Sequence, residues 1–228
     1  MSDAFSVNLA GRVALVTRVD GEIGQAVARA LAQAGAAVAI NGLNPTRVDA
    51  IVSDVQATGG QALGWNGDIS NRMQVSAMIE ATREAFGGLH IVVHVADVMK
   101  RAPLLKLDAY DWQRGLALNL SGAFYFTQFA ARVMTDEDGG TILYIASGDG
   151  QASPQANGAA YTASHAGLLG LMHEAAHALR GAGVRVNAIL SQTAPPDALA
   201  PMALFLCSEG AAEISGQAFT VGAGKSRA

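Results

Sequence analysis

The sequence has a single cysteine, Cys207, and few aromatic or charged side chains, which make up 6% and 15% of its 228 residues. One cysteine cannot form a disulfide within the chain, which favours a reducing compartment and predicts a cytoplasmic protein. Cys207 lies in an apolar run, so we expect a buried thiol rather than a nucleophile. The net charge of −4 gives no reason to expect a nucleic acid or an anionic membrane as partner.

The sequence also lacks a basic start followed by an apolar core, so we expect no signal peptide. No apolar run is long enough to span a membrane. No linker, internal repeat or low-complexity segment divides the chain. We therefore expect one domain over residues 1–228, large enough to bury a substantial core.

What the sequence does contain is an alternation of short apolar runs with segments of helical periodicity. The predicted strands are seven: 12–17, 37–41, 61–68, 90–96, 141–146, 184–190 and 217–221. The longest predicted helices cover about 111–134 and 159–180. Unbroken apolar strands separated by helices are typical of a parallel sheet covered on both faces. The sequence therefore predicts an α/β protein with a Rossmann-type, doubly wound, seven-stranded parallel sheet.

A serine and a tyrosine at a particular spacing suggest a chemistry. Ser147 lies fourteen positions before Tyr161, which opens the run Y-T-A-S-H. From about residue 10 to residue 224 the chain resembles the short-chain dehydrogenase/reductase family, most closely its 3-oxoacyl-acyl-carrier-protein reductase-like branch. The resemblance implies Tyr161 as general acid or base, Ser147 as a hydrogen-bond donor to the substrate oxygen, and Asn119 in a proton relay. The family's lysine, four positions after the tyrosine, is here His165.

His165 weakens the catalytic group that the resemblance implies. A tyrosine has an ordinary pKa near 10, and a fixed ammonium lowers it toward neutrality. A histidine is mostly neutral at pH 7 and too short to replace a lysine that also holds the nicotinamide ribose. One turn along a helix, His165 still lies beside Tyr161. It either forms a weaker acid–base pair or fills vacated space as an ordinary polar residue, and we favour the second interpretation.

The turn after the first strand, T-R-V-D-G-E-I-G at 17–24, is where the family binds the cofactor pyrophosphate. The family's form is Thr-Gly-x-x-x-Gly-x-Gly, and three positions agree: Thr17, Ile23 and Gly24. Arg18 and Glu22 replace the first two glycines. Glu22 would face the pyrophosphate and repel it, whereas the bulky Arg18 could pair with a phosphate. In a second register, Gly21 and Gly24 fit the last two glycines of G-x-G-x-x-G.

The other positions that the resemblance assigns to NAD(P) are mixed. Asp68 and Ile69 resemble the family's Asp-Val pair beside the adenine. Of the family's Asn-Asn-Ala-Gly after the fourth strand, only Ala96 remains. Asp97 replaces the glycine and adds a negative charge, and we expect it to pair with His94 or with solvent. The end of the second strand shows no preference for NAD or NADP.

The family inserts a long substrate loop after the sixth strand. Only residues 191–200 precede the next predicted helix here, so we expect a shortened loop and no lid over the substrate.

A competing motif, H-E-x-x-H, lies at residues 173–177. On a helix it places two imidazoles on one face, as in zinc peptidases, with Glu209 or Glu213 as conceivable third ligands. A Rossmann-type pattern is the wrong scaffold for that chemistry. We expect an exposed or subunit-facing stripe and no metal.

Because the departures cluster where cofactor and substrate would bind, the sequence predicts a non-catalytic or severely impaired subunit. The resemblance implies a homotetramer, or a hetero-oligomer with an active paralogue, through the helices at 111–134 and 159–180. The alternative is an active NAD(P)(H)-dependent oxidoreductase that reduces a ketone or 3-oxoacyl thioester, or oxidises an alcohol, with His165 in place of lysine.

Overall fold

The computed structural model describes residues 7–147, 157–192 and 194–222. Seven strands form one parallel sheet in the order β3-β2-β1-β4-β5-β6-β7, which confirms the predicted fold class. The strands are β1 (Val13–Val16), β2 (Ala37–Gly42), β3 (Ala62–Asn66), β4 (Ile91–Val95), β5 (Gly140–Ser147), β6 (Val184–Gln192) and β7 (Ala218–Gly222).

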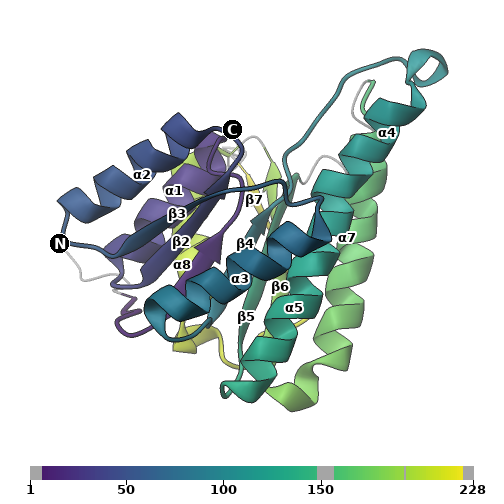
Figure 1. Cartoon of the computed structure of the whole chain (residues 1–228). Helices are drawn as coiled ribbons and strands as arrows, with labels where there is room; N and C mark the ends of the chain where they lie inside the picture. The colour runs from purple at the N-terminus through teal and green to yellow at the C-terminus, as the bar shows by residue number, and fades with distance from the viewer. Residues whose placement is uncertain (1–6, 148–156, 193, 223–228) are drawn as a thin grey trace, which may run out of the picture.

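Helices cover both faces of the sheet (Figure 1). One face is covered by α1 (Glu22–Gln33), α2 (Pro45–Ala57) and α8 (Pro196–Cys207). The other face is covered by α3 (Arg72–Phe86), α5 (Gly122–Asp136) and α7 (Ala159–Ala178), and α4 (Ala109–Leu116) packs against α7. Single turns of 3-10 helix are η1 (Leu104–Lys106), η3 (Arg180–Ala182) and η4 (Glu209–Ala211).

The sequence explains why these elements form where they do. Every residue of β1 and β4 is buried because helices pack on both of their faces. The side chain of Asn44 caps α2 and that of Asn71 caps α3, each by accepting backbone N–H groups of the first turn. Cys207 is buried as expected, and burial raises the pKa of its thiol to about 12. No helix of the described segments has the length and apolarity to cross a membrane.

The helix predicted at 111–134 is interrupted in its middle. A π-helical turn, η2 (Ala117–Ser121), joins α4 to α5 and contains Asn119. Such turns insert one residue into an α-helix and are frequent at functional sites. Periodicity could not reveal it because the helix continues in the same direction on both sides.

The connection after β6 is shorter than the sequence indicated. β6 continues to Gln192 and α8 already begins at Pro196, so the predicted loop at 191–200 is wrong in its bounds. Pro196 occupies the first position of the helix, where a proline loses no hydrogen bond, and Pro201 lies inside the helix. Only residues 193–195 connect the two elements.

Candidate active site

The predicted catalytic and cofactor residues gather at the carboxyl edge of the sheet. In a doubly wound sheet, ligands bind at this edge, where connections from neighbouring strands leave for opposite faces. β1 lies between β2 and β4, so the segments that follow these three strands are neighbours in space. Figure 1 shows α4 and α7 side by side next to this edge.

Arg18 and Asp97 form an ion pair across this edge. Arg18 lies two residues after β1 and Asp97 two residues after β4. Nε and Nη2 of Arg18 both lie 2.9 Å from Oδ1 of Asp97, and their side chains are 18% and 27% exposed. Of the two partners expected for Asp97, His94 or solvent, the first is wrong, because the carboxylate pairs with Arg18. The charges of Arg18 and Asp97 neutralise each other, because the neighbouring parallel strands β1 and β4 end side by side.

The turn between β1 and α1 retains the shape of a phosphate-binding turn. Gly21 caps α1, and a Cβ atom on Gly24 would lie 2.5 Å from the carbonyl oxygen of Arg18, so only glycine fits there. Arg18 itself has φ of 61°, in the left-handed region. A Cβ atom on Gly21 would lie 2.7 Å from Oδ2 of Asp97. The backbone and the guanidinium thus fit a pyrophosphate, provided that Asp97 leaves the space in front of Gly21.

Glu22 differs from Asp97 in its surroundings. It is the first residue of α1 and is exposed. Its carboxylate is solvated and lies at the N-terminus of α1, the positive end of the helix dipole. Screening by solvent weakens the repulsion of a phosphate that the sequence predicted for this residue.

Thr17 and Ala96 hold the strand ends together. The hydroxyl of Thr17 is buried and accepts a hydrogen bond of 3.1 Å from the Val95 N–H. The Ala96 N–H donates to the carbonyl of Ile145 at 2.8 Å. Ile23 is half-buried on α1 beneath the turn. Thr17 and Ala96 thereby join the ends of β1, β4 and β5.

The sequence interpretation missed Asp20 and Arg47. The Asp20 carboxylate accepts hydrogen bonds from the N–H groups of Leu43 and Asn44, at 2.7 and 2.9 Å. Arg47, in the first turn of α2, donates to the Asp20 main-chain carbonyl. Asp20 thereby places a carboxylate against Gly42 at the end of β2, where no acid was expected. Nothing in the spacing of these residues indicates the contact.

Asp68 is held in place before α3. Its carboxylate accepts hydrogen bonds from the backbone and hydroxyl of Ser70, at 2.9 and 2.7 Å, and from Arg114 at 2.8 Å. Burial alone would raise the pKa of Asp68, but the Ser70 and Arg114 hydrogen bonds outweigh it and lower the pKa. The adjacent Ile69 is buried, and its carbonyl lies 3.1 Å from a Cβ placed on Gly122. The predicted pair therefore faces the π turn.

Asn119, in the π turn, and His94, on β4, are both buried. The Asn119 side chain accepts from the Val98 N–H at 3.0 Å and donates to the Val98 carbonyl at 2.9 Å and to Ser164 Oγ at 3.1 Å. Its own carbonyl lies 3.3 Å from Nε2 of His94. The pKa of His94 is lowered to about 4, chiefly by burial and to a smaller extent by Arg18 and His165, which together outweigh the opposing effect of the Asn119 contact. His94 is therefore neutral at pH 7.

Tyr161 and His165 stack on each other in the first turns of α7. Their ring centroids are 4.0 Å apart with an interplanar angle of 36°, and the residues are 7% and 2% exposed. The predicted proximity of the two side chains is confirmed. Ser164 lies between them in sequence and donates to the Tyr161 carbonyl at 2.8 Å, which links the pair to Asn119. The backbone of Ser147 ends β5, but its side chain lies outside the described structure.

The H-E-x-x-H motif forms no metal centre with the other described residues. His173, Glu174 and His177 are exposed on α7. No group of three or more His, Cys, Asp or Glu side chains within the described residues is arranged to hold a metal ion. The conceivable third ligands Glu209 and Glu213 instead line a cavity at the opposite edge of the sheet.

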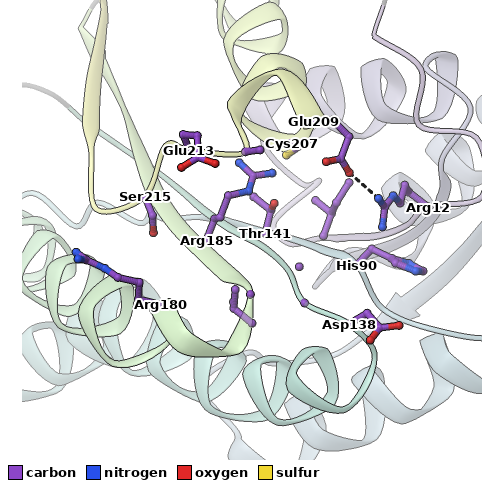
Figure 2. Close-up of a pocket in the computed structure, with 16 residues that line it drawn as sticks. Arg12, His90, Asp138, Thr141, Arg180, Arg185, Cys207, Glu209, Glu213 and Ser215 are labelled. Carbon is purple, nitrogen blue, oxygen red and sulfur yellow. Dashed lines mark hydrogen bonds and ion pairs between the residues drawn. The ribbon is translucent and has the colours of Figure 1, made fainter.

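That cavity, about 640 Å³ in volume, lies where β4, β5 and β6 begin (Figure 2). Two of its arginines have partners: Arg12 pairs with Glu209 at 2.6 Å, and Arg185 donates to main-chain carbonyls at the end of α8 and in η4. No predicted catalytic or cofactor residue lines it. Arg12 and Arg185 thereby tie the end of α8 and the following turn η4 to the sheet.

The short chain dehydrogenase family model matches residues 12–199, most of the chain. The chain therefore belongs to the short-chain dehydrogenase/reductase family. It is 32% identical to a 3-oxoacyl-acyl-carrier-protein reductase of Synechocystis sp., over 95% of this chain and 97% of that protein. It is 33% identical to a D-threitol dehydrogenase of Mycolicibacterium smegmatis, over 98% and 96%. A short-chain type dehydrogenase/reductase from Mycobacterium marinum superposes with a TM-score of 0.92, 27% identity and full coverage of both chains.

Proposed function

We propose that the protein is an oxidoreductase that uses a nicotinamide dinucleotide to interconvert a carbonyl and an alcohol. The observation that carries the proposal is the buried stack of Tyr161 and His165, 4.0 Å between ring centroids, at the ligand-binding edge of the sheet. Membership of the family supports it, as do relatives named as a reductase and a dehydrogenase that share about a third of their residues with this chain.

In the proposed mechanism, Tyr161 donates a proton to the substrate oxygen during reduction and accepts it during oxidation. Ser147 hydrogen-bonds the same oxygen. His165, when protonated, stabilises the Tyr161 phenolate less strongly than a lysine would, because its side chain is shorter and does not carry a permanent charge. Asn119 positions Tyr161 through Ser164. The dinucleotide, when bound, supplies or accepts the hydride.

The cofactor is proposed to lie over the turn from Thr17 to Gly24. Backbone N–H groups at the start of α1 and the Arg18 guanidinium would bind the pyrophosphate. Asp68 and Ile69 would flank the adenine, and Ala96 the nicotinamide side. No described residue indicates a choice between NAD and NADP.

Charge is the reason to prefer a working enzyme over the non-catalytic subunit expected from the sequence. That expectation rested on several departures around the cofactor and substrate, among them two acids that would repel the pyrophosphate. Asp97 is neutralised by Arg18 at 2.9 Å, and Glu22 is exposed to solvent. Like charges screened by water interact by only about 1 kcal/mol at contact distances, which does not exclude a cofactor with many favourable contacts.

The short connection from β6 to α8 supports an open substrate site. β6 ends at Gln192 and α8 begins at Pro196, so the two elements follow each other closely where the family inserts its substrate loop. Closed lids exclude water and complete the catalytic arrangement. We therefore propose slow turnover with broad tolerance of substrate size.

A second copy of the chain is the proposed partner, in a homotetramer. The groove between α5 and α7 is lined by apolar side chains that include Phe124 and Leu171, with Arg132 and Glu174 in the same groove. A two-fold axis along such a groove brings opposite charges of the two copies together. A hetero-oligomer with a related subunit would use the same surface.

A non-catalytic subunit remains the second candidate. It is favoured by the loss of the lysine at His165 together with the short β6–α8 connection. In this alternative the protein acts by binding other subunits through the α5–α7 groove, and Ser147 and Tyr161 no longer take part in catalysis.

Turnover separates the two candidates. The purified protein is incubated with NADH or NADPH and either a simple ketone or a 3-oxoacyl thioester, and dinucleotide oxidation is followed. We expect slow turnover that Tyr161→Phe abolishes and Tyr125→Phe, which removes a hydroxyl on α5, preserves. Absence of turnover with both dinucleotides, or equal rates in Tyr161→Phe, would favour the non-catalytic subunit.

A further inference from the structure

Asp97 occupies the place in this fold where a phosphate would bind. The pyrophosphate of a dinucleotide lies at the N-terminus of the helix after the first strand. Oδ2 of Asp97 lies 2.7 Å from the position of a Cβ on Gly21, the residue that caps that helix. Its Oδ1 holds the Arg18 guanidinium. Asp97 thus presents an anion to both groups that a phosphate would use.

We propose that Asp97 is an internal competitor for the cofactor phosphate, and that Arg18 exchanges the Asp97 carboxylate for the pyrophosphate when a dinucleotide binds. The inference rests on the proposed function because it assumes that a dinucleotide binds at this turn. Carboxylate and phosphate are interchangeable partners of a guanidinium, which binds both through paired N–H donors.

The surroundings of Arg18 favour such an exchange. Both side chains of the pair are partly exposed, so the pair can open toward solvent without breaking the core. Among the described acids, Asp97 is the one within ion-pair distance of Arg18. The nearby Asp20 carboxylate is held by the Leu43 and Asn44 N–H groups and is not free to replace Asp97.

The exchange makes opposite predictions for the two partners. Substituting Asp97 removes the competing anion and leaves Arg18 free for the phosphate, so the affinity for the dinucleotide rises. Substituting Arg18 leaves an unpaired carboxylate in front of Gly21, so the affinity for the dinucleotide falls. If Arg18 were only an obstruction, its removal would instead raise affinity.

The test measures NADPH and NADH affinities by fluorescence titration of the wild type, Asp97→Asn, Arg18→Gln and the double variant. We expect Asp97→Asn to bind about tenfold tighter and Arg18→Gln about tenfold weaker, with the double variant between them, because each change gains or loses about one charge-assisted contact. Asp54→Asn breaks a comparable pair with Arg29 on the outer surface and should leave affinity unchanged.

Thermal unfolding without cofactor provides the second readout. Asp97→Asn and Arg18→Gln should each lower the melting temperature slightly, because each removes the same ion pair, although they move affinity in opposite directions. Should Arg18→Gln fail to fold, Arg18→Lys takes its place and should also bind more weakly, since an ammonium lacks the paired donors.

Three outcomes decide the matter. Unchanged or weaker binding by Asp97→Asn, with binding by the wild type, overturns the exchange and leaves the proposed function standing. Tighter binding by an Arg18 variant also overturns it, in favour of simple obstruction. Absence of binding in the wild type and every variant overturns the proposed function and the exchange together.

Discussion

The imidazole of His165 lies against the ring of Tyr161, 4.0 Å away between centroids, with both residues nearly excluded from solvent. A lysine in the same helical position would place a permanent charge near the phenol, whereas the imidazole places an aromatic ring on it. The two side chains are in contact, but the imidazole stabilises the Tyr161 phenolate less strongly than a lysine ammonium would.

His165→Lys should therefore increase turnover about tenfold or more at neutral pH. A fixed positive charge within about 4–6 Å lowers the pKa of an acid by about 1–3 units. The pH at which alcohol oxidation reaches half its maximum should fall by about one unit or more, because Tyr161 loses its proton more readily. The pH profile of kcat measures this shift. His177→Lys, on the exposed face of the same helix, should not change the profile.

Asn119→Ala should destabilise the protein by about 3 kcal/mol, because the Val98 N–H and carbonyl each lose a buried partner. Urea denaturation measures the loss. Asn187→Ala provides a matched control, since that buried side chain also bridges two main-chain groups, the Gln217 N–H and the Ile214 carbonyl. Asn187→Ala should lower stability without changing the pH profile of turnover, whereas Asn119→Ala should change both. Equal pH profiles would contradict the positioning role of Asn119.

Stability should fall in acid because of His94. Its pKa is lowered from 6.5 to about 4 by burial, so below pH 6.5 the unfolded chain binds a proton that the folded protein does not. The loss grows as pH falls from 6.5 to about 4 and reaches about 3 kcal/mol. Urea denaturation at several pH values measures how steeply the free energy of unfolding falls with pH. In His94→Asn this fall should be less steep between pH 6.5 and 4 than in the wild type. An equally steep fall would indicate that another group titrates.

Much of the fold could be predicted from the sequence because its signals are local. The apolar runs predicted at 12–17 and 90–96 contain the buried strands β1 and β4. The site was less predictable because its decisive contacts are distant in sequence. Arg18 and Asp97 are 79 positions apart, and only the adjacency of β1 and β4 brings them together.

Two further differences have physical reasons. Asp20 reaches the end of β2 because the turn after β1 bends toward that strand, and no periodicity encodes the direction of a turn. The bounds of α8 were wrong because Pro201 was taken as the start of the helix, although Pro196 can begin it equally well.

Assembly can be tested at the α5–α7 groove. Ala178→Arg places a charge in the groove without disturbing the core, because Ala178 is exposed in the single chain. Light scattering after size exclusion should show a tetramer for the wild type and smaller species for this variant. Ala50→Arg, exposed on α2, should remain tetrameric. A monomeric wild type would contradict the proposed self-association.

The central claim is that this chain transfers a hydride, with Tyr161 as its acid. Its most direct test is a long incubation of stoichiometric enzyme with a ketone and NADH or NADPH deuterated at the transferable position, followed by mass spectrometry of the alcohol. The account predicts one deuterium on the carbinol carbon with the wild type and none with Tyr161→Phe. An alcohol free of deuterium, or no alcohol with either dinucleotide, would contradict it.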